Sequence, residues 1–163
     1  MTFGNPDWEG SPWILNAEQS LPLLKKAYDV GINTWDTADM YSNGESEVIV
    51  GRALKEFAIP RSRIVILTKL YNPILEGSNI RPDPGPHDAQ YVNQMGLSRK
   101  HIFDAVEGSL RRLQTDYIDV LQLHRLDHET EPEEIMRALH DLVAMGKVRY
   151  LGGSSMYTWE FAR

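Results

Sequence analysis

The sequence contains no cysteine among its 163 residues. This absence excludes a disulfide framework, a thiolate zinc site and a cysteine nucleophile. No apolar run approaches the roughly 20 residues that a membrane-spanning helix requires, and the opening stretch MTFGNPDWEG lacks the basic and apolar regions of a signal peptide. Together these absences predict a cytoplasmic protein in a reducing compartment, with no membrane partner.

Positive charge is also scarce in this sequence. The 17 Lys and Arg residues are outnumbered by 23 Asp and Glu residues, which gives a formal net charge of -6. Because nucleic-acid phosphates are bound by clustered Lys and Arg, this balance argues against a nucleic-acid partner. The length and the hydrophobic fraction of 42% suit one globular domain with a real core. We therefore predict a single domain over residues 1–163, and nothing in the composition indicates an oligomeric state.

Helical and strand-like patterns alternate along the chain. Apolar residues at helical spacing predict four helices, at residues 16–31, 46–57, 98–114 and 130–146. Ser46 and Ser98 are the predicted N-caps of the second and third. Between the helices lie the short apolar runs GINTW, RIVILT, YIDVLQL and VRYLGG. Their continuous apolar character is typical of parallel strands buried on both faces, so the alternation predicts an α/β fold with right-handed crossovers.

One long segment, Tyr71–Gly96, interrupts this alternation. It carries four prolines and three glycines and has no helical period. Connections of this length are usually functional or disordered. Because the segment follows a strand, we expect it to lie over the carboxyl ends of the sheet. Two interpretations remain open, a lid or substrate loop and an insertion without a specific role.

Polar residues follow each of the predicted strands. In strand order they are Asp36 with Tyr41, then Lys69, then His124, then Ser154 with Ser155. The carboxyl ends of parallel strands meet at one edge of a sheet or barrel, where active groups gather. A single charged residue after a strand is ordinarily solvated. Four complementary groups at consecutive strand ends instead predict a shared site formed by Asp36, Tyr41, Lys69 and His124.

The residue types in this set indicate proton transfer to a carbonyl oxygen. A free phenol is a poor proton donor at neutral pH, and an adjacent ammonium makes it a better one. Lys69 supplies that ammonium, and Asp36 keeps it protonated and oriented. Tyr41 is then the predicted general acid, while His124 hydrogen-bonds the same oxygen. Because no side chain delivers hydride, a nicotinamide cofactor is implied.

A metal site is not predicted from these residues. His124, Asp127 and His128 spell H-x-x-D-H, but this spacing follows a strand and does not lie along a helix face. The neighbouring carboxylates of Asp39, Glu45 and Glu47 are expected to be solvated in a loop and a first helical turn, with a structural role for Glu47. Gly51 is expected to reflect tight packing between elements.

Several motifs resemble those of the aldo-keto reductase family. They are DTADMY, the Thr68–Lys69 pair, LQLH and GKVRYLGGSS. The stretches GLSRKHI, SLRRLQTDYIDVLQLHR and SSMYTWEFA are similar to the aryl-alcohol dehydrogenase-like branch of that family. The resemblance implies NADP(H) as cofactor and interconversion of small-molecule carbonyls and alcohols. It implies that Asp36, Tyr41, Lys69 and His124 are the family's catalytic tetrad.

The resemblance also carries implications for the cofactor and the fold. It implies that Ser154 and Ser155 contact the nicotinamide carboxamide, and that Asp36 belongs to the cofactor site. The matching positions correspond to strands two to five of a (β/α)8 TIM barrel with their helices. We therefore expect an incomplete barrel in residues 1–163, with the first strand and the sixth to eighth strands missing from this sequence.

Two other functions remain open at this stage. The chain resembles the potassium-channel β subunits as well, so a truncated, catalytically inactive nucleotide-binding or regulatory protein is one alternative. His124 favours the enzyme over that alternative. A Schiff-base lyase acting through Lys69 is the second. Asp36 and Tyr41 beside Lys69 would keep the amine charged, which opposes nucleophilic chemistry.

Overall fold

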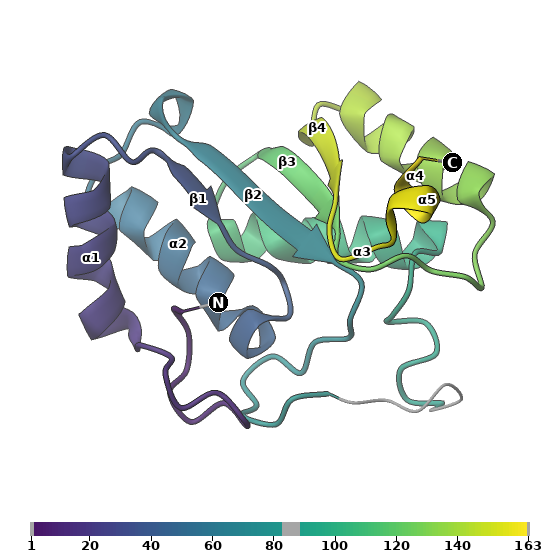
Figure 1. Cartoon of the computed structure of the whole chain (residues 1–163). Helices are drawn as coiled ribbons and strands as arrows, with labels where there is room; N and C mark the ends of the chain where they lie inside the picture. The colour runs from purple at the N-terminus through teal and green to yellow at the C-terminus, as the bar shows by residue number, and fades with distance from the viewer. Residues whose placement is uncertain (1, 83–88, 163) are drawn as a thin grey trace.

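The computed structural model describes residues 2–82 and 89–162 and confirms the predicted alternation of helices and strands (Figure 1). In chain order the elements are α1 (Ala17–Asp29), β1 (Thr34–Asp36), η1 (Tyr41–Gly44), α2 (Glu45–Glu56), η2 (Arg61–Arg63), β2 (Val65–Leu70), α3 (Arg99–Leu113), β3 (Ile118–Leu123), α4 (Pro132–Ala144), β4 (Val148–Gly153) and α5 (Thr158–Phe161). The first strand is shorter than predicted. Gly31 closes α1 with a φ of 92° and therefore does not join β1.

The four strands form one parallel sheet in the order β1-β2-β3-β4. Each strand pairs with the next one along the chain, which is the neighbour order of a barrel section. The register aligns Asp36, Leu67, Val120 and Tyr150 in one row across the sheet. Two rows further on, Lys69 aligns with Gln122. This register fixes where each strand ends relative to its neighbours at the carboxyl edge of the sheet.

The two faces of the sheet differ in burial. In β2 the side chains of Ile66, Thr68 and Leu70 are almost fully buried against the helices, which Figure 1 shows on one side of the sheet. Val65 and Tyr150 lie on the other face, where 36% and 71% of their surface is exposed. Among the described residues, the prediction of strands buried on both faces is therefore right for one face only.

The two predicted N-caps have different outcomes. Ser98 caps α3 as predicted, since its side chain accepts a hydrogen bond from the backbone N–H of His101. Ser46 does not cap α2. That helix begins at Glu45 after Gly44, whose φ of 94° only glycine adopts without strain. Ser46 instead lies buried inside the first turn of α2.

The described parts of the long segment after β2 are held in place by specific hydrogen bonds. The side-chain amide of Asn43 donates to the carbonyls of Ser78 and Ile80, at 2.9 and 2.7 Å. The backbone N–H of Gly96 donates to the carbonyl of Tyr71 at 2.8 Å, so the two ends of the segment meet. Residues 83–88, which belong to the same segment, lie outside the described residues.

Helices α2 and α3 approach each other closely at Gly51, and this contact gives a first testable prediction. A Cβ added at Gly51 would lie 2.5 Å from the carbonyl oxygen of Arg112. Gly51→Ala is therefore expected to lower the free energy of unfolding by about 1–3 kcal/mol, because the helices must separate. Urea denaturation measures the loss, with Lys55→Ala on the exposed side of α2 as the control. A Gly51→Ala variant as stable as the wild type would contradict the close approach.

Candidate active site

Backbone hydrogen bonds continue the sheet beyond its strand ends and bring the predicted site residues together. The N–H of Asp39 donates to the carbonyl of Lys69 at 3.0 Å. The N–H of His124 donates to the carbonyl of Leu70 at 3.0 Å. The N–H of Ser154 donates to the carbonyl of Leu123 at 2.9 Å. The loops after four consecutive strands therefore start side by side at the carboxyl edge.

Lys69 and Asp36 form an ion pair at this edge. The Lys69 ammonium, on a residue only 6% exposed, donates to a carboxylate oxygen of Asp36 and, at 2.8 Å, to the carbonyl of Thr37. The other Asp36 oxygen accepts from the side-chain amide of Gln122 at 3.0 Å. Two acceptors, the Asp36 carboxylate and the Thr37 carbonyl, thus orient the ammonium through charge-assisted hydrogen bonds, and Gln122 in turn holds the Asp36 carboxylate.

Tyr41 lies beside both Lys69 and His124. The Lys69 ammonium nitrogen is 5.2 Å from the centroid of the Tyr41 ring. The rings of Tyr41 and His124 meet edge to face, with centroids 5.7 Å apart and an interplanar angle of 77°. The four residues predicted as one constellation therefore do lie together in the structure.

The turn after Tyr41 has an unusual backbone. Ser42 and Asn43 have φ values of 50° and 51°, and Gly44 follows with 94°. Three consecutive left-handed residues are costly outside glycine and persist only where other contacts hold them. The three hydrogen bonds of the buried Asn43 side chain, to the backbone of Leu75, Ser78 and Ile80, supply such contacts. The turn therefore fixes Tyr41 at the start of a rigid segment.

His124 is held neutral in this site. Burial, together with the positive charges of Lys69 and Arg125, lowers the pKa of His124 from 6.5 to about 4. The Nδ1 atom of the ring is buried without a hydrogen-bond partner among the described residues. At neutral pH the imidazole therefore offers a hydrogen bond and no charge to a group bound beside Tyr41.

The low pKa of His124 predicts how stability depends on pH. The unfolded chain takes up a proton at His124 near pH 6.5, whereas the folded chain does so only near pH 4. The unfolded state then binds more protons in this window, so the free energy of unfolding should fall by roughly 2 kcal/mol from about pH 7 to about pH 5 through this residue. Urea denaturation of the wild type and His124→Gln at both pH values measures this difference.

The control for this pH experiment is His140→Gln, since His140 is exposed on α4. It should keep the wild-type pH dependence, because the substitution leaves His124 in place. A His124→Gln variant with the same pH dependence as the wild type would show that His124 is not held neutral.

The predicted cofactor residues Ser154 and Ser155 follow β4 directly. Ser154 is partly buried and Ser155 is exposed, with a left-handed φ of 49°. Their hydroxyl oxygens are 3.4 Å apart. Gln122 is a site residue that the sequence analysis missed. Its position two residues before His124, on the same face of the sheet as Lys69, was the available signal.

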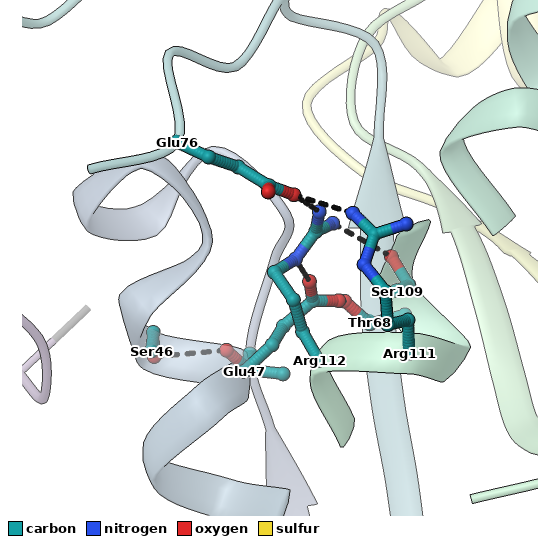
Figure 2. A network of polar contacts seen from close by, with 8 residues as sticks. Ser46, Glu47, Thr68, Glu76, Ser109, Arg111 and Arg112 are labelled. Carbon is teal, nitrogen blue, oxygen red and sulfur yellow. Dashed lines mark hydrogen bonds and ion pairs between the residues drawn. The ribbon is translucent and has the colours of Figure 1, made fainter. Parts of the chain in front are cut away.

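Two carboxylates predicted to be solvated are completely buried, and this prediction is wrong. Asp39 and Glu47 are both 0% exposed. The Glu47 carboxylate accepts hydrogen bonds from Thr68 and from Arg112, which compensate its burial (Figure 2). Burial, with the nearby negative charge of Glu47, raises the pKa of Asp39 well above its ordinary value. Asp39 is therefore a neutral acid at pH values where exposed aspartates are charged.

Among residues 2–82 and 89–162, no group of three or more His, Cys, Asp or Glu residues is arranged to hold a metal ion. In the same ranges no helix is both long and apolar enough to cross a bilayer. The Asp127 carboxylate near His124 instead accepts hydrogen bonds within the loop, from the N–H of Leu97 at 2.7 Å and from Thr130 at 2.8 Å.

Comparison with known proteins relates the whole chain to one family. The Aldo/keto reductase family model matches residues 1–163. The chain is 58% identical to versiconal hemiacetal acetate reductase of Aspergillus parasiticus over 99% of this chain and 47% of that protein. It is 46% identical to AAD16 of Saccharomyces cerevisiae, a protein named as an aryl-alcohol dehydrogenase, over 99% of this chain and 48% of that protein.

A solved structure gives the same result for the fold. Aldo-keto reductase AKR11C1 from Bacillus halodurans, in its holo form, superposes with a TM-score of 0.70 at 34% identity. The match covers 86% of this chain and 42% of that one. The chain thus spans about half the length of the relatives it matches, and its four-stranded parallel sheet fits an incomplete barrel.

Proposed function

The chain belongs to the aldo/keto reductase family, and from that premise we propose that it carries the proton-transfer site of an NADP(H)-dependent oxidoreductase interconverting aldehydes or ketones and alcohols. One observation supports this proposal above the others. The Lys69–Asp36 ion pair, the Tyr41 ring and the neutral His124 converge at the carboxyl edge of the sheet. The set contains a proton donor, a fixed cation and a neutral hydrogen-bond donor, which are the groups that carbonyl reduction needs.

Each residue has a distinct role in the proposed reaction. Tyr41 donates its phenolic proton to the carbonyl oxygen as negative charge develops there, and the Lys69 ammonium stabilises the phenolate that remains. Asp36 keeps Lys69 charged and aimed through the ion pair. His124 donates a hydrogen bond to the same oxygen and orients the carbonyl. In the oxidation direction Tyr41 takes the proton back from the alcohol.

The residues present fit a nicotinamide cofactor. When bound, this cofactor supplies the hydride that no side chain can deliver. Ser154 and Ser155 offer two hydroxyls at the end of β4, and each hydroxyl both donates and accepts hydrogen bonds, as an amide group requires. We assign these two serines to the nicotinamide carboxamide. The preference for NADP(H) is part of the proposal and follows the family resemblance.

The relatives suggest the class of substrate. Their names refer to a hemiacetal acetate and to aryl alcohols. We therefore propose aryl aldehydes and related aromatic carbonyls of secondary metabolism as substrates for this site.

The test measures hydride transfer in a chimera with one of the longer relatives. A chimera is made by replacing the aligned segment of the Aspergillus parasiticus reductase with residues 1–163, a graft that 58% identity over 99% of the chain makes compatible. We expect the chimera to oxidise NADPH when an aromatic aldehyde is added, and to do so more slowly with NADH. A folded chimera that binds NADPH without turnover would favour the inactive, nucleotide-binding alternative. Trapping of the substrate on Lys69 by borohydride would favour the lyase.

A further inference from the structure

Two threonines lie directly behind the Lys69–Asp36 ion pair. Thr37 follows Asp36 along the chain, and Thr68 precedes Lys69. Because side chains alternate between the faces of a strand, Thr68 points away from the site and toward the helices. Both threonines are buried, at 1% and 0% exposure. Residues of the helices that bind these two threonines are therefore linked to the site through the strands.

The first turn of α2 holds both threonines. The Thr68 hydroxyl donates to one carboxylate oxygen of Glu47 at 2.6 Å. The Thr37 hydroxyl donates to the hydroxyl of Ser46 at 2.9 Å. Ser46 and Glu47 are adjacent in the chain, so one helical turn fixes the ends of two neighbouring strands (Figure 2). The carbonyl of Thr37 in turn accepts a hydrogen bond from the Lys69 ammonium.

Arg112 of α3 fixes the Glu47 carboxylate. Its Nε donates to the second carboxylate oxygen of Glu47 at 2.7 Å, and both side chains are buried, at 7% and 0% exposure. The Arg112 side chain fits against Gly44, where an added Cβ would come within 2.6 Å of its Cδ atom. A second carboxylate, Glu76 of the segment after β2, accepts from Arg112 at 2.7 Å. The guanidinium therefore has little freedom to move.

We propose that the Glu47–Arg112 pair acts as a positioning device for Lys69, fixing the ammonium through Thr68 from the opposite face of the sheet. Hydrogen bonds to a buried charge are short and directional, so Glu47 defines where the end of β2 lies. Displacements near 1 Å at a reacting group cost about 100-fold in rate, so a shifted ammonium should slow the reaction. This catalytic consequence rests on the proposed function. The position of the ammonium itself is measurable without any turnover.

The experiment measures how fast Lys69 is acetylated in the 163-residue chain by an N-hydroxysuccinimide ester, followed by mass spectrometry. Thr68→Val removes the hydroxyl at nearly constant size, and Thr68→Ser keeps it. Loss of a hydrogen bond to a charged group predicts a rise in the Lys69 labelling rate of about ten-fold or more for Thr68→Val. Thr68→Ser is expected to restore the slow labelling of the wild type.

Two controls separate positioning from loss of stability. Ser20→Ala deletes another fully buried hydroxyl, which donates to the carbonyls of Leu15 and Asn16, and should leave Lys69 labelling unchanged. Lys147 is partly buried and ion-paired to Glu107, so its labelling in the same sample reports general loosening. The proposal is overturned if Thr68→Val leaves Lys69 protected, or if labelling of Lys69 and Lys147 rises equally.

The chimera supplies a second and separate measurement. Thr68→Val should lower kcat by about ten-fold or more with little change in KM, and should shift the pH dependence of kcat/KM, because the misplaced ammonium no longer assists Tyr41. Thr68→Ser should recover both. A chimera without any turnover would count against the proposed function alone, and the labelling experiment would still decide whether Glu47 positions Lys69.

Discussion

Replacing Tyr41 by phenylalanine is expected to abolish carbonyl reduction by the chimera while leaving NADPH binding close to that of the wild type. The substitution removes the phenolic oxygen and keeps the ring, whose edge-to-face contact with His124 should persist. General acid catalysis by a positioned side chain contributes about 100- to 10,000-fold, so kcat should fall by roughly that factor. The Lys69 ammonium donates to Asp36 and to the carbonyl of Thr37, so we do not expect it to replace the phenol as proton donor.

The measurement is NADPH oxidation under single-turnover conditions, with cofactor affinity determined separately by titration. Tyr117→Phe is the matched control, because it deletes a phenolic oxygen just before β3 begins, at the opposite edge of the sheet from the site. That variant should reduce aldehydes at the wild-type rate. Undiminished turnover by Tyr41→Phe would remove Tyr41 from the role of general acid, and loss of cofactor binding would assign it a structural role instead.

The positions of the site residues could be predicted from sequence because they depend on local pattern alone. Each apolar run ends at a recognisable residue, and parallel strands bring their carboxyl ends to one edge whatever the tertiary detail. Asp36, Lys69 and His124 follow this rule directly. Tyr41 lies five residues beyond Asp36, and its place depends on the left-handed turn through Ser42 and Asn43, which the sequence signals only through the glycine that follows.

The buried carboxylates could not be predicted in the same way. Glu47 follows a helix start, where carboxylates are ordinarily solvated and favourable. The residue that makes its burial possible, Arg112, lies 65 positions further along the chain and on another helix. The local sequence pattern does not predict such a pair, because the stability of a buried charge depends on where its partner lies in three dimensions. The wrong assignment of Ser46 as an N-cap has a similar origin, since the preceding left-handed turn moves the start of α2.

The buried charges also permit a prediction that separates stability from positioning. Arg112→Met is expected to lower the free energy of unfolding by about 3–5 kcal/mol, because it leaves Glu47 buried without its cation. Glu47→Leu should cost less than Arg112→Met. When Glu47 is absent, the Arg112 guanidinium still pairs with the carboxylate of Glu76, so its positive charge keeps a partner. Urea denaturation of both variants near pH 7 measures the order of the two losses.

The double variant, Glu47→Leu with Arg112→Met, completes this argument. Replacing both members of a buried ion pair by apolar residues of similar size is often neutral or stabilising, so the double variant should recover much of the stability that Arg112→Met loses. Thr68 would nevertheless have no carboxylate to bind, and we expect Lys69 in this folded variant to be acetylated about ten-fold faster than in the wild type. A double variant that is stable and keeps Lys69 protected would show that the pair serves folding alone. A stable variant with an exposed Lys69 would show that the charge pair is retained for the geometry of the site.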